Sequence, residues 1–319
     1  FLDNRLAALT AAIGCNAILV SLSCRPHQFT HLGLASLTWI VSVYQTRGDK
    51  KVLYWIPPIF ALWVNLHGGY AVGLVYLWMM VGAIAADKFI DNRCSEIIPA
   101  CKALGLAALL GTAATLLNPY GWGAWMYAIE IANLKSSSAG IVDEWAATTI
   151  KNDVGFQYFI ITSAMFVCMI SSAKRPSVGA LLTAIALAAT GWAALRISIM
   201  MTILMVPLLA AWLRHTPFYS MAFDGKARRY DILVKPVVAG LVVISTLGLS
   251  LVASPADKAA RKYVTANFPE QELSFIQTSN LQGQILNAPE SGGYLIRKAA
   301  LKVALDTRLD LYGDRALFE

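Results

Sequence analysis

The sequence predicts an all-α polytopic membrane bundle of about nine transmembrane helices, followed by the start of a small extracytoplasmic α/β domain. Hydrophobic residues make up 57% of the chain and charged residues only 14%, whereas soluble domains are about half apolar and a quarter charged. Apolar runs close to the length of a membrane span recur between residues 7 and 253. Basic residues gather in alternate connections between these runs.

The predicted membrane domain, residues 1–253, is defined by these apolar runs. They fall at residues 7–24, 31–46, 52–66, 69–86, 103–117, 155–173, 177–194, 197–213 and 235–253. Two of them, 52–66 and 103–117, are short for independent spans, so the count carries an error of about one. Because the chain starts at Phe1 and ends inside a patterned segment, we interpret it as part of a longer protein.

The basic residues predict the orientation of the bundle. With the N-terminus in the cytoplasm, most of them fall in inner connections at residues 47–51, 87–102, 172–175 and 214–235. The outer connections before the tail carry only Arg25, Lys135, Lys151 and Arg196. The net charge of +7 is therefore a topology signal, and we expect no nucleic-acid partner.

The tail, residues 254–319, changes in character. It is richer in Pro, Gly and Asn, with a helical pattern at 258–278 and short strand patterns at 283–287, 293–296 and 302–306. These patterns favour a partial extracytoplasmic α/β domain.

The cysteines do not predict a metal site. The five of them lie in or beside apolar runs without metal-ligand spacing, which favours a packing role. No glycine-rich phosphate loop follows a strand, so soluble nucleotide-dependent chemistry is not expected.

Polar residues collect in the predicted outer connections. Asn65 and His67 lie where two apolar runs meet, and a tight helix–helix connection is the plain alternative reading of that stretch. Ionisable residues at a membrane edge are costly to bury, which favours a functional site. The other outer polar residues are Arg25, Asn118, Arg196 and, in the long loop 118–154, the acidic pair Asp143 and Glu144 before Trp145.

Several short motifs occur in the order found in a known family. They are Arg25-Pro26, Trp63-x-Asn65-Leu66-His67-Gly68-Gly69, Leu117-Asn118-Pro119-Tyr120-Gly121, Glu144-Trp145, and Gly292-Gly293-Tyr294-Leu295 with Asp306-x-Arg308-x-Asp310-x-Tyr312-Gly313. From about Arg25 to its end, the chain resembles bacterial multi-pass membrane proteins placed with the GT-C type glycosyltransferases.

The resemblance implies that a sugar moves from a polyprenyl-phosphate carrier to a glycan, lipid or protein acceptor. The reaction would take place on the extracytoplasmic side of the bacterial cytoplasmic (inner) membrane. Such enzymes place an acidic residue in the first outer loop, as a base or as the partner of a divalent metal ion. Here the first visible loop has Arg25 and His27 but no carboxylate. Either the true first loop lies upstream of Phe1 or this branch uses another arrangement, and the metal requirement stays open.

The predicted catalytic residues are Glu144, His67 and Asp143. Glu144 would remove a proton from the acceptor hydroxyl, and Asp143 has a solvated acidic turn as its alternative. His67 would donate a hydrogen bond or accept a proton near neutral pH.

The predicted substrate-binding residues match a phosphate-bearing sugar donor. Arg25 and Arg196 offer planar multi-donor forks for the phosphate. Asn65 and Asn118 would bind sugar hydroxyls or fix loops. Trp63 and Trp145 would stack on the sugar or pack a prenyl chain.

Two other functions remain open. In a transporter or flippase the outer polar residues would line a substrate vestibule, but we find no internal repeat of the kind that transporters often show. In a non-catalytic membrane scaffold, the outer domain would bind a partner.

Overall fold

The computed structural model describes residues 25–138, 147–219, 269–281, 283 and 285–304. The chain divides into two compact units, residues 1–246 and 247–319, and each is described by itself. Helices account for most of the described residues, and no strand occurs among them. The predicted helical character is therefore confirmed.

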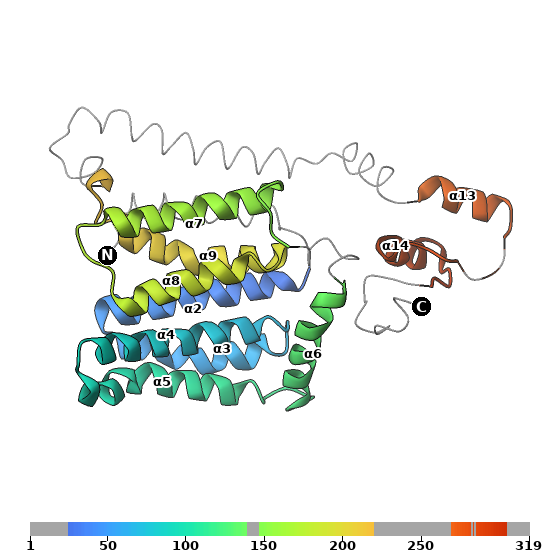
Figure 1. Ribbon diagram of the computed structural model, residues 1–319. Coiled ribbons are helices and arrows are strands. Elements are labelled where there is room, and N and C mark those ends of the chain that lie inside the picture. The colour runs from blue at the N-terminus through green and yellow to red at the C-terminus, as the bar shows by residue number, and fades with distance from the viewer. Residues whose placement is uncertain (1–24, 139–146, 220–268, 282, 284, 305–319) are drawn as a thin grey trace. The chain divides into compact units, whose positions relative to one another are not determined.

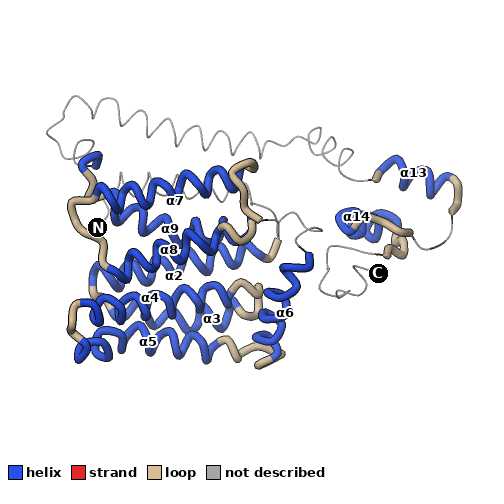
Figure 2. Tube along the Cα trace, in the orientation of Figure 1, coloured by secondary structure: helices blue, strands red, loops and turns tan. Residues whose placement is uncertain are grey.

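The first unit is a set of helices, most of which lie alongside one another, whereas α6 runs across the others (Figures 1 and 2). In chain order they are α2 (His27–Arg47), η1 (Lys50–Trp55), α3 (Ile56–Trp63), α4 (Tyr70–Ile90), η2 (Cys94–Glu96), α5 (Ile97–Ala114), α6 (Gly123–Ser138), α7 (Asp153–Ser171), α8 (Val178–Gly191) and α9 (Leu195–Leu213). Helix α9 packs on α2, α7 and α8, while α4 packs on α5 and α8.

Local sequence sets several helix starts. The side chain of Asn152 accepts the Gly155 N–H at the start of α7, and that of Ser177 accepts the Ala180 N–H at the start of α8. Such caps satisfy N–H groups that have no partner within the helix. Helix α3 has proline in its first turn, where the missing N–H costs no helical hydrogen bond.

Four helices in the described part of the chain are long and apolar enough to cross a membrane. They are α4, the continuous segment Cys94–Ala114, α7 and α9. Helix α8 is apolar but has 14 residues, and α2 has 21 residues but carries more polar side chains. These helices indicate a membrane protein. The first and last of the nine predicted spans lie outside the described residues.

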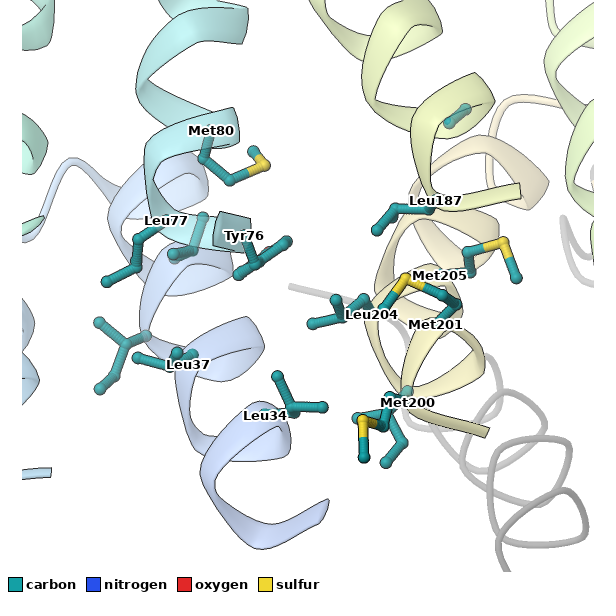
Figure 3. Packing of buried hydrophobic residues seen from close by; sticks show 14 of the residues in the cluster. Leu34, Leu37, Tyr76, Leu77, Met80, Leu187, Met200, Met201, Leu204 and Met205 are labelled. Carbon is teal, nitrogen blue, oxygen red and sulfur yellow. The ribbon is translucent and has the colours of Figure 1, made fainter. Parts of the chain in front are cut away.

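Apolar side chains of α2, α4, α8 and α9 make the centre of the bundle. Figure 3 shows Leu34 and Leu37 of α2 with Leu77 of α4, and Leu187 of α8 beside Leu204 of α9. In lipid, such helices associate through close packing more than through exclusion of water. Small residues allow this approach: Gly179 of α8 lies against the backbone of α4, where an added Cβ would collide with the Ala83 carbonyl.

Helix α6 begins within the long predicted outer loop, five residues after Asn118. Its first turn is tied to the bundle, since the Tyr70 hydroxyl donates to the Ala124 carbonyl (2.9 Å) and the Trp125 indole donates to Thr115 Oγ1 (3.0 Å). Trp122 stacks on Trp125 and remains 63% exposed. An exposed tryptophan here is typical of a membrane–water interface.

All the described connections that were predicted as outer meet at one end of the bundle. We name it the His67 end: the start of α2, residues 64–69, residues 115–122 and residues 192–195. The Thr148 N–H and hydroxyl also bond the last turn of α8 there. The opposite end, the Glu96 end, holds residues 87–96, 172–177 and 214–216. Its segments are joined as well, because the Ala173 N–H donates to the His215 carbonyl (2.9 Å).

The described part of the second unit holds α13 (Glu270–Thr278) and α14 (Pro289–Ala299). The strand predicted at 293–296 is wrong, because these residues lie inside α14. Proline at the first turn and the left-handed Ala300 at the end define that helix. Between the other two predicted strands, one isolated parallel bridge joins Ile285 to Val303. The α/β character is thus not established by the described residues.

Candidate functional site

Polar side chains from three separate segments meet at the His67 end. Thr30 Oγ1 lies 2.7 Å from His67 Nδ1, and Arg196 Nη2 lies 3.2 Å from His67 Nε2. Thr30 belongs to α2, His67 to the α3–α4 connection and Arg196 to the first turn of α9. We use the name His67 cluster for these residues together with Trp63, which bonds Thr30, and with His27, Gln28 and His31 of α2, whose histidines act on the pKa of His67.

The α2 part of the cluster follows from helical spacing. His27 and His31 are four residues apart and share one face of the helix. Their rings meet edge to face with centroids 5.3 Å apart. Gln28 bridges them, with its amide nitrogen 2.9 Å from His27 Nε2 and its amide oxygen 3.2 Å from His31 Nδ1. Both imidazoles are buried, so this face of α2 places polar groups inside the bundle.

A tight turn presents His67 to this face. After α3 ends at Trp63, the His67 N–H donates to the Trp63 carbonyl (3.0 Å), which closes the turn. The Gly69 N–H then donates to His67 Nδ1 (3.1 Å) immediately before α4 begins. A Cβ at Gly69 would collide with the Thr30 side chain, so only glycine permits this approach of α2 to the turn.

Trp63 packs inside the bundle and holds the cluster residue Thr30. Its ring is 2% exposed and lies between glycines of two helices, where an added Cβ would come within 2.6 Å of it at Gly33 and 2.7 Å at Gly73. Its indole N–H donates to Thr30 Oγ1 (3.2 Å). The predicted stacking of Trp63 on a sugar needs an exposed ring face, which this burial removes. Trp63 instead positions Thr30.

The electrostatic surroundings keep His67 neutral. Burial and, less strongly, the positive charge of Arg196 lower the pKa of His67 to about 4. His27, His31 and Arg25 contribute smaller effects of the same sign. At neutral pH, the cluster therefore combines a guanidinium cation with an uncharged imidazole.

The two predicted asparagines fasten the connections around the cluster. Asn65 donates to the Ala61 carbonyl (2.8 Å) and the Leu117 carbonyl (2.9 Å), joining the α3 turn to the end of α5. Asn118 donates to the carbonyls of Thr115 (2.7 Å) and Gly121 (3.0 Å). These contacts correspond to the loop-fixing alternative for both residues.

The remaining predicted site residues lie apart or outside the description. Arg25 is exposed at the start of α2, near enough to affect the pKa of His67. Asp143, Glu144 and Trp145 lie outside the described residues, so their roles stay predictions.

Sequence reasoning missed Thr30, Gln28 and His31. The predicted span began at residue 31, whereas α2 begins at His27 and carries these residues inside its first turns. The signal was present in the i, i+4 pair of histidines, which places both rings on one helical face.

The cluster suits an anion better than a divalent cation. Arginine offers several N–H donors in a plane and binds phosphate or carboxylate oxygens through two of them. In the described part of the chain, no three His, Cys, Asp or Glu side chains are placed to hold a metal ion, the three cluster histidines included. The donor set therefore does not fit a metal here, and no step is assigned to one.

Comparisons with known proteins give no match: no family model, no curated protein and no solved structure resembles the chain closely enough to count as a relative.

Proposed function

We propose that the chain is the membrane part of a sugar transferase that uses a polyprenyl-phosphate-linked donor. In this proposal about nine helices span the bacterial cytoplasmic membrane, and the His67 end faces the extracytoplasmic side together with a C-terminal α/β domain. The sugar passes to a glycan, lipid or protein acceptor.

One observation carries the proposal: Arg196 Nη2 and His67 Nε2 approach to 3.2 Å at one end of an apolar helical bundle. A polyprenyl phosphate keeps its chain among the lipids and its charged phosphate at the membrane edge, so its binding site needs cationic donors beside the ends of membrane helices. Arg196 supplies such a fork, and Arg25 adds positive charge.

The other predicted residues complete the assignment. Glu144 removes the proton of the acceptor hydroxyl, with Asp143 beside it, and Trp145 stacks on the sugar. Asn65 and Asn118 hold the connections that frame the site, as their backbone contacts support.

The test measures binding and transfer with the full-length protein in lipid nanodiscs. A polyprenyl phosphate is titrated against wild type, Arg196→Ala and Arg196→Lys, with the uncharged polyprenol as the ligand control. We expect Arg196→Ala to weaken phosphate binding by about tenfold or more, and lysine to restore part of it, because a charged hydrogen-bonded pair is lost. Arg214→Ala, at the other end of α9, is the matched control for the loss of one charge and should bind as wild type does.

A second measurement separates transfer from transport. Sugar transfer from the lipid-linked donor to an acceptor should be lost in Glu144→Gln while binding persists. Equal affinity for the phosphate and the alcohol would contradict the proposal. Binding accompanied by movement of the lipid across the bilayer, without transfer, would replace it with a flippase.

A further inference from the structure

The ring of His67 has three close polar neighbours. Nδ1 faces the Gly69 N–H (3.1 Å) and Thr30 Oγ1 (2.7 Å), while Nε2 faces Arg196 Nη2 (3.2 Å). A neutral imidazole carries one N–H and one acceptor nitrogen. Since Gly69 and Arg196 offer only donors, the ring cannot accept from both, and one of the two contacts has to give way.

The contact with Gly69 is the fixed one. Its N–H belongs to the backbone immediately before α4, and the turn that carries His67 is closed by backbone hydrogen bonds. Arg196 reaches the ring with a long, flexible side chain whose donors can turn to another acceptor. The geometry therefore makes Nδ1 the acceptor and leaves the proton on Nε2.

The contact with Thr30 also supports Nδ1 as the acceptor nitrogen. The Trp63 indole N–H, which can only donate, already occupies a lone pair of Thr30 Oγ1 (3.2 Å). The Thr30 hydroxyl is fully buried and lies 2.7 Å from Nδ1, so its proton is best placed on that nitrogen. Trp63, Thr30 and His67 thus form a directed chain of hydrogen bonds that ends at Nδ1.

We infer that His67 is held as the neutral Nε2–H tautomer and that its Nε2–H and the Arg196 guanidinium donate together to one oxyanion. The two donor groups lie 3.2 Å apart, so one oxygen placed between them can accept hydrogen bonds from both. Of the two roles that the sequence left open for His67, this assigns the hydrogen-bond donor and not the base. Thr30, Trp63 and Gly69 are positioning residues. The inference rests on the proposed function only in taking the oxyanion to be the phosphate of the lipid-linked donor.

The low pKa of His67 agrees with this arrangement. Protonation would place a second N–H on Nδ1, directly against the Gly69 N–H, in addition to the repulsion from Arg196. The neutral His67 ring therefore still offers an N–H donor but adds no second positive charge beside Arg196.

The test is ¹⁵N NMR of the full-length chain in lipid bilayers, with only histidine labelled. The chain has 4 histidines, so a His67→Gln variant assigns the His67 signals directly. We expect an unprotonated Nδ1 and a protonated Nε2 at neutral pH. A polyprenyl phosphate, and inorganic phosphate as the headgroup control, should shift the Nε2 signal while Nδ1 stays in place.

Three variants test the positioning residues. Thr30→Val keeps the shape of the side chain but removes the hydroxyl, and it should mix the two tautomers and weaken phosphate binding by about tenfold. Thr30→Ser should restore both properties. Trp63→Phe, which removes the indole donor, should have a smaller effect in the same direction.

The outcomes separate this inference from the proposed function. A protonated Nδ1 in the wild type, or wild-type tautomer and affinity in Thr30→Val, would overturn the inference even if sugar transfer is demonstrated. Failure of sugar transfer with the Nε2–H tautomer and its phosphate response present would overturn the proposed function alone.

Discussion

The two ends of the bundle hold their polar groups in different ways. At the Glu96 end, Lys88 and Arg93 form ion pairs with Glu96 at 2.8 and 2.6 Å, between residues close in sequence and with side chains 23–52% exposed. At the His67 end, buried or half-buried groups are joined between residues 37 and 129 positions apart. Exposed pairs contribute little to stability, whereas buried polar groups are costly unless satisfied. The second arrangement is the one that we propose binds a ligand.

Glycine also serves the two ends differently. Gly179 at the Glu96 end lies against the backbone of α4, and its N–H donates to the Asp87 side chain (2.6 Å). Gly69 at the His67 end lies against a side chain, that of Thr30. One glycine fixes the separation of two helices, and the other allows a hydrogen-bonded chain to form.

The largest effect on stability is expected from a substitution of Gly179. In Gly179→Ala, the new methyl group would meet the Ala83 carbonyl, which cannot move without displacing α4. Overpacking of this kind costs about 1–3 kcal/mol, and we expect the upper part of that range. Thermal unfolding followed by tryptophan fluorescence measures it. The matched control is Gly82→Ala in α4, where nothing lies within 4 Å and stability should stay equal or rise. Equal effects of both substitutions would contradict the packing argument.

The next largest effect is expected from Gly69→Ala, and it should appear mainly as a loss of phosphate affinity. In Gly69→Ala, the methyl group would push the Thr30 side chain away from His67, breaking the chain of hydrogen bonds that starts at Trp63. We expect phosphate affinity to fall by about tenfold with a smaller loss of thermal stability than in Gly179→Ala.

The neighbouring glycine is the control for Gly69. Nothing lies within 4 Å of a Cβ at Gly68, so Gly68→Ala should bind phosphate as wild type does. If the two alanine variants lose affinity equally, the turn itself and not the Thr30 contact controls the site.

Much of the bundle follows from sequence, because apolar runs predict helices and basic residues predict which connections share a side. His67 and Arg196 were both assigned to the outer side from these patterns. The direct contact between His67 and Arg196 was not predicted, because the patterns do not state that α9 packs beside α2. That neighbourhood depends on which helices fit together, and it is visible only in the assembled bundle.

Tertiary packing also explains the two misread positions. Trp63 was predicted to stack on a sugar or pack a prenyl chain, but Gly33 and Gly73 on adjacent helices leave room for its whole ring inside the bundle. The stretch 293–296 begins at the second of two glycines, Gly292 and Gly293, and was predicted as a strand next to a turn. The proline at the start of α14 and the buried Leu295 agree with the helix that is present. For Trp63, the deciding neighbours lie on two other helices, α2 and α4.

A smaller effect on stability is expected from a change of pH, acting through His67. The folded-state pKa of His67 is about 4, below its ordinary 6.5, so the unfolded chain binds the proton more readily. Stability should therefore decrease as pH falls from about 6.5 to about 4 and change no further through this group below that. Arg196, His27, His31 and Arg25 are the groups that act on it. Unfolding temperature measured across this range should fall less steeply in His67→Gln. An unchanged slope would show that His67 binds its proton equally well in the folded and the unfolded chain.

The smallest effect is expected from the ion pairs of the Glu96 end. Glu96→Gln removes the partner of both Lys88 and Arg93, but these side chains are half-buried to exposed, so water can replace the contact. We expect the unfolding temperature to stay within experimental error, with added salt making no difference between variant and wild type. Phosphate affinity should not change either, because the pair lies at the end of the bundle opposite His67. If Glu96→Gln weakens phosphate binding, the two ends are coupled through α4, which connects them, and the His67 cluster is not an independent site.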